Sequence, residues 1–354
     1  MTKKLSLYIL QQKCYNIIKY AEKERNIIFM KFKICVIGCG DVAIDNHGHT
    51  YLRYKNENPD AVLAGCCDLS IEKAEYFSGN FGFLRAYTDL YKMLDIEKPD
   101  AVCLLSPVKA TCKLSIEVIK LGYPLILEKP PGLSPSETME IIKAAEERNA
   151  KVRVAFNRRY APLVISLKNE LADQRVLSVT NTFVRHERDD PDFSTTAIHG
   201  IDTIRHLADS DYKEAFIEYQ KLDSGIYNFY IYCKFNSGAV GQIILRPTGG
   251  VQLERYMVGT ENATYFLDMP IWDSIDKPGK ILKTEDGHIS KIITGDSLVK
   301  NDIPSENLGF YNENAMFFDD IKSNAEFSIN DLKASLQTVA ITEALRNRKT
   351  SVVF

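Results

Sequence analysis

The sequence lacks an excess of charge of either sign. Its 44 lysines and arginines nearly balance its 47 aspartates and glutamates, so the formal net charge is only −3. A surface that follows the phosphates of a nucleic acid, or that binds an anionic membrane, needs a large basic excess. We therefore expect no nucleic-acid partner and no membrane partner, and no apolar run is long enough to cross a bilayer.

The cysteines lack the spacing of a disulfide framework or of a zinc site, although eight are present. Cys35 and Cys103 lie within apolar runs, where cysteine acts as a small buried hydrophobe. Cys66 and Cys67 would point to opposite faces of a strand, so they cannot bind one ion there. We expect no metal site and a reducing, cytoplasmic compartment.

The chain has enough length for two domains. With 354 residues, of which 45% are apolar, it exceeds one ordinary domain and can bury a sizeable core. We place a first domain at residues 30–157 and a second at 158–354, whose last strand or helix could return to the first. Residues 1–29 form either an amphipathic helical extension or upstream sequence wrongly included, because Met30 is a plausible true start.

Short apolar runs alternate with helical patterns over the first domain. Continuous runs of Val, Ile and Leu are typical of strands buried on both faces, and helices between them form right-handed crossovers in a parallel sheet. One helix has a clear start, with Ser134 as N-cap, Pro135 in the first turn and Glu137 three residues after the cap. We predict a doubly wound α/β domain, with strands at 32–37, 61–67, 101–105, 124–127 and 152–156 and helices at 71–81, 111–121 and 134–148.

Alternation of apolar and polar residues takes over after about residue 160. A period of two is typical of strands with one buried face, and glycine turns separate several of these stretches. We predict an α+β domain with a large open, mostly antiparallel sheet that is covered on one face. The predicted strands are 176–186, 216–219, 227–235, 240–246, 254–266 and 351–354, and the predicted helices are 195–208, 312–323 and 329–346.

A glycine turn follows the first predicted strand and opens a helix, in the pattern Gly38-x-Gly40-x-x-Ala43. The first glycine permits the tight turn, the second lets the backbone approach a pyrophosphate, and the small third residue lets helix and strand pack closely. The helix N-terminus offers N–H groups to phosphates. The turn predicts a Rossmann dinucleotide site, although another α/β protein, such as a methyltransferase, could also use it. The residues expected to bind the cofactor here are Gly38, Cys39, Gly40, Asp41, Val42 and Ala43.

An acidic residue, Asp68, stands at the end of the second predicted strand. A carboxylate at this place can accept hydrogen bonds from both ribose hydroxyls, and it would repel a 2′-phosphate. We therefore expect NAD as the cofactor rather than NADP. A methyltransferase can also place an acid there, so the choice between the two classes depends on other parts of the chain.

A later strand delivers Glu128-Lys129-Pro130 to the carboxyl edge of the predicted sheet. Ligands of open α/β folds bind at this edge. Beside a nicotinamide, a lysine ammonium can stabilise the alkoxide character that develops on a substrate hydroxyl as hydride leaves, and it can pass a proton. The alternative is a Lys-Pro pair at the surface with no catalytic role.

Taken together, the motifs resemble the glucose-fructose oxidoreductase/inositol dehydrogenase/MocA (Gfo/Idh/MocA) family over residues 32 to 354. Several of them occur in the family's order across both predicted domains. The matching residues are Val36-Ile37-Gly38-Cys39-Gly40, Asp68, Ser106-Pro107, Glu128-Lys129-Pro130, Phe156-Asn157-Arg158-Arg159-Tyr160-Ala161-Pro162 and His199-Gly200-Ile201-Asp202.

The resemblance implies that Lys129 is the catalytic lysine and that the Lys129–Pro130 bond is cis. It also implies that Ser106, Pro107, Glu128 and Lys129 take part in binding the cofactor. The second domain should then be the family's open mixed sheet, whose free face commonly builds dimers or tetramers.

Two departures from the family pattern concern the site itself. Where the family often has Asn and His after Ser106-Pro107, this chain has Val108 and Thr111. Many members also place an Asp four residues before the active-site histidine, and the matching residue here is Thr195, which has no carboxylate. Thr195 therefore marks either a different proton route or a lost activity.

A histidine in the second domain is our candidate acid/base. His199 and Asp202 are three residues apart, so they lie on one face of the predicted helix. A neutral imidazole that titrates near physiological pH can accept a hydroxyl proton. The alternative is a core histidine bonded to the backbone. Asp202 either orients His199 or caps the site, and His206 is interpreted as structural.

The remaining basic residues are more ambiguous. Arg185 or Arg188 could hold a polar or anionic substrate, but a charge run of this kind is usually a solvated loop. The pair Arg158 and Arg159 is more typical of ion pairing at the domain junction than of a substrate-binding site. We expect the substrate pocket at the sheet face and the loops around 185–195 and 246–250, with Lys129, Asn157, Arg185, Thr195, His199 and Asp202 around the substrate.

The sequence therefore predicts an NAD-dependent dehydrogenase that moves a hydride between nicotinamide and a secondary alcohol or ketone of a sugar, inositol or related polyol. The competing hypotheses are an NAD-binding sensor or inactive relative without dehydrogenase activity, and a lyase or hydrolase that uses NAD transiently. We expect a small-molecule substrate and a homodimer or homotetramer that forms through the second domain's sheet.

Overall fold

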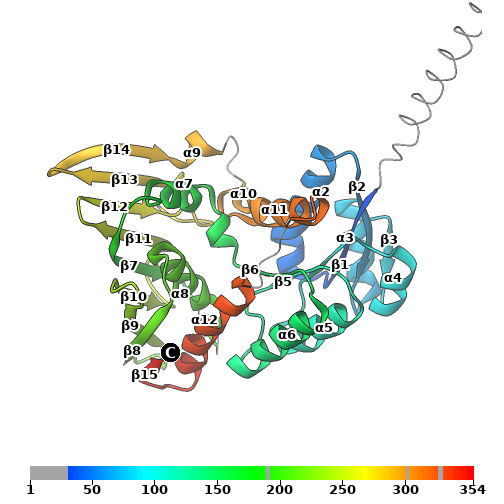
Figure 1. Cartoon of the computed structure of the whole chain (residues 1–354), viewed down its shortest axis with the longest axis horizontal. Coiled ribbons are helices and arrows are strands. Elements are labelled where there is room, and N and C mark those ends of the chain that lie inside the picture. Colours follow the sequence, from blue (N-terminus) through cyan, green and yellow to red (C-terminus); the bar gives the residue numbers. More distant parts are fainter. Residues whose placement is uncertain (1–30, 189–191, 300–302, 326–329) are drawn as a thin grey trace, which may run out of the picture.

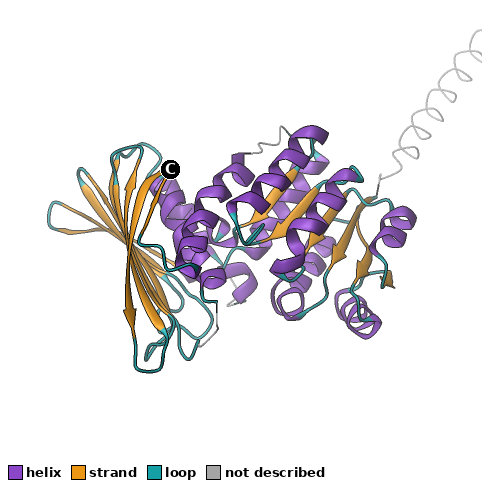
Figure 2. Ribbon diagram, turned by 90° about the horizontal axis from the view of Figure 1, so that it is seen from below, coloured by secondary structure: helices purple, strands orange, loops and turns teal. Residues whose placement is uncertain are grey.

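The computed structural model describes residues 31–188, 192–299, 303–325 and 330–354. The expected N-terminal extension at 1–29 lies outside these residues. The described chain forms a parallel sheet with helices on both faces and a larger sheet beside it (Figure 1). Helices lie between the two sheets, so the two halves of the chain are packed closely together (Figure 2).

The first sheet has six strands, all parallel, in the order β3-β2-β1-β4-β5-β6. This is the order of a doubly wound Rossmann sheet, and its switch point lies between β1 and β4. The predicted fold of the first half is confirmed. The strands are β1 Phe32–Ile37, β2 Ala61–Cys67, β3 Arg85–Tyr87, β4 Ala101–Leu104, β5 Leu125–Glu128 and β6 Val152–Ala155.

Helices cover both faces of this sheet because each buries an apolar side against the strands. The predicted start of α6 is confirmed, since Ser134 accepts a hydrogen bond from the backbone N–H of Glu137. These helices are η1 Ala43–His47, α2 Gly48–Glu57, α3 Ile71–Phe81, α4 Leu90–Glu97, α5 Val108–Lys120 and α6 Pro135–Arg148, followed by η2 Asn157–Tyr160.

Two elements of the first half are absent from the prediction. The edge strand β3 has only three residues, and Arg85 is exposed, so it carries no apolar run. The helix α4 begins at an Asp89 cap, whose side chain accepts hydrogen bonds from the backbone N–H groups of Tyr91 and Lys92. Both were missed because their burial comes from neighbouring elements rather than from a long local pattern.

The second sheet has nine strands in the order β14-β13-β12-β11-β7-β10-β9-β8-β15. It is antiparallel except for the pair β7 and β10, so the predicted large, mostly antiparallel sheet is confirmed. The described helices lie on one face of it, and the other face is open (Figure 2). The strands are β7 Val176–Val184, β8 Tyr212–Lys221, β9 Tyr227–Phe235, β10 Val240–Arg246, β11 Leu253–Thr260, β12 Ala263–Asp268, β13 Lys280–Glu285, β14 His288–Thr294 and β15 Ser351–Val353.

One prediction for this sheet is wrong. The stretch 254–266 was expected as a single strand, but it forms β11 and β12, which pair with each other as a hairpin. Two consecutive exposed polar residues, Glu261 and Asn262, form the turn between the two strands. The hairpin of β13 and β14 was not predicted, because every residue from His288 to Ile292 is exposed and β14 has no buried face.

The helices of the second half hold the two sheets together. Phe317 and Phe318 of α11 join the core on one face of the Rossmann sheet, and Leu332 of α12 joins the core on the other face, together with Ile198 of α8. The last strand, β15, pairs with β8 of the second sheet. These helices are α7 Pro162–Glu170, α8 Ser194–Ala208, α9 Gly295–Leu298, α10 Pro304–Asn307, α11 Phe310–Lys322 and α12 Asn330–Arg346.

The described cysteines are all free thiols, and all are buried except the half-buried Cys112. Among the described residues, no three His, Cys, Asp or Glu side chains gather in a way that could hold a metal ion. In the same part of the chain, every helix is too short or too polar to span a membrane.

Candidate active site at the carboxyl edge of the first sheet

The glycine turn after β1 has the two properties that a phosphate-binding turn needs. Gly38 has a φ of +101°, and a Cβ added there would lie 2.4 Å from the carbonyl oxygen of Leu105. At Gly40, by contrast, an added Cβ would meet no protein atom within 4 Å. Gly38 thus permits the fold of the turn, whereas Gly40 leaves open space above the backbone. A dinucleotide pyrophosphate fits this space, because it needs close approach to N–H groups at a helix start.

The helix that follows the turn packs closely on the sheet. Ala43 is 1% exposed, in agreement with the small residue that the motif requires, whereas Asp41 and Val42 are exposed beside the turn. The exposed helix start therefore lies at the switch point of the sheet, where open α/β folds bind their ligands.

Asp68 lies directly beside the glycine turn. One of its carboxylate oxygens, Oδ2, accepts a hydrogen bond from the backbone N–H of Cys39 at 2.9 Å, and Oδ1 accepts one from the N–H of Ser70 at 3.0 Å. Asp68 is half-buried, so its oxygens keep a face toward solvent. The structure therefore brings the predicted acid and the predicted turn together, and the acid also orders the turn.

The loop after β4 is held by a pair of hydroxyl groups. Ser106 Oγ and Thr111 Oγ1 are 3.1 Å apart, and Thr111 is 2% exposed on the first turn of α5. Pro107 immediately precedes this helix. Thr111, at the position of the family's His, therefore forms a hydrogen bond with Ser106 within the loop.

Glu128 ends β5 and bonds to a histidine of the first helix. Its Oε1 lies 2.8 Å from Nε2 of His47, which is 1% exposed. The other ring nitrogen of His47 lies 3.3 Å from the side-chain amide of Asn314 in α11. No local signal in the sequence pointed to this contact, because the two residues are 81 positions apart.

Lys129 joins the two halves of the site. The Lys129–Pro130 bond is cis, as the resemblance implied. The ammonium of Lys129 donates a hydrogen bond to the backbone oxygen of Thr195, in the first turn of α8, at 3.1 Å. Burial lowers the pKa of Lys129, and the positive charges of Arg158, Arg188 and Arg185 lower it further, whereas Glu128 opposes the shift.

His199 lies one helical turn after Thr195, on the same side of α8. It is 8% exposed, and its Nδ1 has no hydrogen-bond partner among the described residues. Burial, together with the charges of Lys129, Arg158 and Arg185, holds the pKa of His199 well below its usual value. The imidazole is therefore neutral at physiological pH, and its Nδ1 atom is buried without a partner among the described residues.

The carboxylate of Asp202 binds an arginine instead of His199. Arg159 donates to both of its oxygens, at 2.6 and 2.7 Å, and Asp202 is 1% exposed. Asp202 therefore has a guanidinium partner in place of the expected contact with His199. The expected ion-pairing role of Arg159 agrees with this contact.

A second buried ion network lies beside Lys129. The carboxylate of Glu254 accepts hydrogen bonds from Arg158 at 3.2 and 3.3 Å and from Arg185 at 3.0 Å, and all three side chains are at most 1% exposed. Tyr256 also donates to Glu254, at 2.7 Å. Arg185 was expected to contact the substrate, but the structure commits it to Glu254 and packs its guanidinium over the ring of Phe183, 3.6 Å from the ring centroid.

Sequence reasoning missed Glu254, although a signal for it exists. Glu254, Tyr256 and Val258 alternate along β11 and all three are buried. A carboxylate on the apolar side of an alternating strand requires a buried cationic partner. Asn157, which was expected near the substrate, is buried, and its amide donates to the carbonyl of Leu308 at 2.9 Å.

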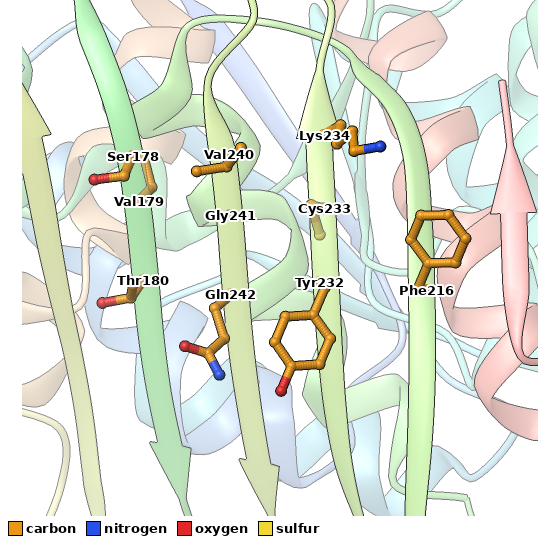
Figure 3. A pocket seen from close by; sticks show the side chains of 10 residues that line it. All are labelled: Ser178, Val179, Thr180, Phe216, Tyr232, Cys233, Lys234, Val240, Gly241 and Gln242. Atoms are coloured by element: carbon orange, nitrogen blue, oxygen red, sulfur yellow. The ribbon is translucent and has the colours of Figure 1, made fainter.

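Two hollows lie outside this cluster. One, of about 500 Å³, lies between the start of α8 and the end of α12 and is lined in part by Asp192 and Pro247, within the two loops that were expected to form the pocket. The other, of about 360 Å³, lies on the second sheet. Figure 3 shows the side chains that line it, on the neighbouring strands β7, β10, β9 and β8.

Parts of this chain are similar in sequence to known proteins. Residues 32–156 match a family described as "Oxidoreductase family, NAD-binding Rossmann fold". The chain is 29% identical over 142 residues to "Oxidoreductase P35" of Formosa agariphila, a match that covers 40% of this chain and 43% of that protein. It is 26% identical over 129 residues to "D-glucoside 3-dehydrogenase" of Escherichia coli, which covers 36% of each protein. Less than half of either relative's length is therefore matched.

Both domains resemble those of solved structures. One is a levoglucosan dehydrogenase in complex with NADH and L-sorbose, with a TM-score of 0.76 at 18% identity, over 91% of this chain and 98% of that chain. At this identity the likeness shows the common fold of the two domains.

Proposed function

We propose that this chain is an NAD-dependent dehydrogenase of the Gfo/Idh/MocA oxidoreductase family, whose NAD-binding Rossmann fold matches residues 32–156. Its substrate is a secondary alcohol or ketone of a sugar, inositol or related polyol. The observation that carries the proposal is the juxtaposition of the Lys129 ammonium, at the end of β5, with the first turn of α8, which also bears His199.

The two side chains have complementary roles in the proposed reaction. His199 is neutral and has a ring nitrogen without a partner, so it accepts the proton of the substrate hydroxyl. Lys129 donates a hydrogen bond to the same oxygen and stabilises the negative charge that develops there. Bound NAD would supply the hydride acceptor at the nicotinamide ring.

We infer NAD rather than NADP from the position of Asp68. Its carboxylate stands beside the glycine turn, with Oδ2 bonded to the N–H of Cys39. A ribose with a free 2′-hydroxyl can donate to this carboxylate, whereas a 2′-phosphate would bring about two negative charges against it.

The experiment that tests the proposal is a spectrophotometric screen for NADH formation with a panel of neutral and acidic sugars and polyols. Dehydrogenase activity predicts substrate-dependent, stoichiometric NADH. Tight NAD binding with no NADH from any substrate supports the alternative of a sensor or inactive relative. Product formation without net NADH supports a lyase or hydrolase that uses NAD transiently.

We also propose that the open face of the second sheet joins two copies of the chain. Five large apolar side chains on its strands are between 37% and 52% exposed: Phe216, Tyr232, Val240, Met257 and Phe266. The first three line the hollow in Figure 3. Exposed large apolar side chains on one face of a sheet are typical of a face that a second copy covers.

A further inference from the structure

We propose that His47 is a positioning residue of the proposed active site and that it acts through Glu128, the residue before Lys129. The inference rests on the proposed function and adds a residue that belongs to none of the motifs on which the family resemblance rests. By donating a hydrogen bond to the Glu128 carboxylate, His47 fixes a negative charge one residue away from the proposed catalytic lysine.

The contact between His47 and Glu128 joins the first helix of the Rossmann domain to the strand end that precedes Lys129. The Nε2 atom of His47 lies 2.8 Å from Oε1 of Glu128, and the two side chains are 1% and 12% exposed. A largely buried carboxylate is unfavourable unless it is hydrogen-bonded, so this contact stabilises the carboxylate and restricts its direction. Glu128 is the last residue of β5, and Lys129 follows it directly in the chain.

The backbone that leads to His47 departs from a regular α-helix. Ala43–His47 form a π-helical turn, in which the N–H of Gly48 donates to the carbonyl of Ala43, five residues earlier. Such turns are rare and occur frequently at functional sites, and the wider turn changes the direction in which the following side chains point. His47 is the last residue of this turn, and its ring packs edge-on against that of Phe310 in α11, with the centroids 5.1 Å apart. The cofactor helix is therefore irregular at the residue that reaches Glu128.

The second ring nitrogen of His47 determines which proton faces Glu128. Nδ1 lies 3.3 Å from the side-chain amide nitrogen of Asn314 and 3.4 Å from the hydroxyl of Tyr51. The same amide nitrogen donates to the carbonyl of Phe310 at 2.8 Å, and an amide nitrogen is only a donor. With the amide in this orientation, Nδ1 accepts from Asn314. The imidazole therefore carries its proton on Nε2 and donates it to Glu128.

A second carboxyl, that of Glu313, lies in α11 one residue before the asparagine that contacts the imidazole. It is 0% exposed, and neither of its oxygens has a hydrogen-bond partner among the described residues. Burial raises the pKa of Glu313 well above its usual value, and the negative charge of Glu128 raises it further. Asp202 acts in the same direction, whereas Arg153 and Arg159 oppose the shift. Glu313 is therefore a neutral acid at physiological pH, and the hydrogen-bonded carboxylate of Glu128 carries the negative charge of the pair.

The charge of Glu128 bears directly on its neighbour in the chain. Burial lowers the pKa of Lys129, as do the charges of three arginines, whereas Glu128 opposes the shift. These arginines are Arg158, Arg188 and Arg185. The ammonium form of the lysine is the one that can stabilise negative charge on a substrate oxygen. A carboxylate that His47 holds in place therefore favours the form of Lys129 that the proposed reaction needs.

Two substitutions separate the hydrogen bond of His47 from its other contacts. His47→Gln keeps an N–H donor at the position of Nε2, whereas His47→Asn places its amide at the position of Nδ1 and does not reach Glu128. With the substrate found in the screen, His47→Asn should lower kcat/KM by about tenfold or more, and His47→Gln should stay within about threefold of the parent. Equal values of kcat/KM in the two variants overturn the inference.

Tyr54→Phe is the matched control for packing between α11 and the helix that follows the cofactor turn. Tyr54 is 1% exposed on α2, and its hydroxyl donates to Asp319 of α11 at 2.7 Å. The variant removes a hydrogen bond between the same two helices and leaves Glu128 untouched, so kcat/KM should stay within about threefold of the parent. A loss as large as that of His47→Asn would mean that the site responds only to the packing of α11, which overturns the inference.

The pH profile of kcat/KM distinguishes positioning from packing. Glu128→Gln removes the charge that opposes the lowered pKa of Lys129, so the loss of kcat/KM with rising pH should begin at a lower pH. His47→Asn should move this limb in the same direction, and it should have little further effect in the Glu128→Gln background, because both changes act on one group. A fall in kcat/KM with an unchanged pH profile, or additive effects in the double variant, overturns the inference.

NADH binding covers the case in which the screen finds no substrate. The dehydrogenase proposal then fails, and the same variants are compared in NADH affinity by fluorescence, because Glu128 is expected to contact the cofactor. His47→Asn should weaken binding by about threefold or more, with no further loss in the Glu128→Gln background, whereas His47→Gln and Tyr54→Phe should bind as the parent does. Equal affinity of His47→Asn and the parent overturns the inference in that case.

Discussion

The ammonium nitrogen of Lys129 lies 3.1 Å from the backbone carbonyl oxygen of Thr195. This hydrogen bond connects the end of β5 to the first turn of α8, one turn before His199. The contact uses a backbone atom, so it does not depend on the side chain at position 195. Replacement of the family's Asp by Thr therefore leaves the lysine anchored and removes only a charge.

The two glycines of the cofactor turn should respond differently to alanine. Gly38→Ala forces a Cβ to within 2.4 Å of the Leu105 carbonyl at a positive φ, so the protein should unfold at a clearly lower urea concentration. Gly40→Ala meets no protein atom and should leave stability within about 1 kcal/mol of the parent, but it should weaken NAD binding by about tenfold or more. Urea titration and NADH fluorescence measure the two effects. If Gly40→Ala binds NAD normally, the pyrophosphate does not pass over this turn.

Asp68 should control the choice between the two nicotinamide cofactors. Asp68→Asn removes the negative charge, so KM for NAD should rise and KM for NADP should fall, with the ratio moving by about tenfold or more. Asp68→Glu keeps the charge and serves as the control. A cofactor ratio that is the same in the parent and in Asp68→Asn would show that the carboxylate does not face the ribose.

The low pKa of His199 predicts a pH-dependent stability. Its folded pKa lies well below 6.5, so the unfolded chain binds a proton in a range where the folded chain does not. The contribution of His199 is therefore present above pH 6.5 and is lost as the pH falls below it. Burial also lowers the pKa of His206, to about 3, and His206 contributes in the same direction.

Comparison with a variant isolates the share of His199. The loss in urea midpoint between pH 7.5 and pH 5.5 should be smaller in His199→Gln than in the parent, by an amount equivalent to about 1 kcal/mol. The same variant should lose most of its turnover. Identical pH dependence in the two proteins would mean that the histidine is protonated or exposed in the folded state.

The open sheet face should set the oligomeric state. Phe216→Asp combined with Tyr232→Asp places two charges in the hollow of the second sheet, so the assembled protein should dissociate to monomers in light scattering. Tyr76→Asp is the control, because Tyr76 is 57% exposed on α3 of the first domain. A parent that is monomeric at micromolar concentration contradicts the proposed interface.

The fold could be predicted wherever the pattern of buried and exposed residues is complete within one local segment. The strands β1 and β2 and the helix α3 have the predicted bounds, because their apolar periodicity is complete within each segment. The strand β3 and the hairpin of β13 and β14 could not be predicted. These strands are held in place by pairing with neighbouring strands, and their own residues are largely exposed.

The site could be predicted only in part, because its contacts join distant segments. Lys129, Asp68 and His199 stand where their motifs placed them, at strand ends and on a helix face. The partner of Asp202 is 43 residues away, and that of Arg158 is 96 residues away. No spacing rule connects such pairs, so the ion network around Glu254 became visible only in the folded chain.

The most direct test of the account is the Lys129→Ala variant, assayed for both NAD binding and turnover. With the substrate found in the screen, kcat/KM should fall by at least about a hundredfold, because the developing charge on the substrate oxygen loses its stabilising ammonium. The affinity for NADH, measured by fluorescence, should stay within about threefold of the parent, since the glycine turn and Asp68 are unchanged. A variant that keeps most of its turnover would contradict the assignment of Lys129, and with it the proposed active site.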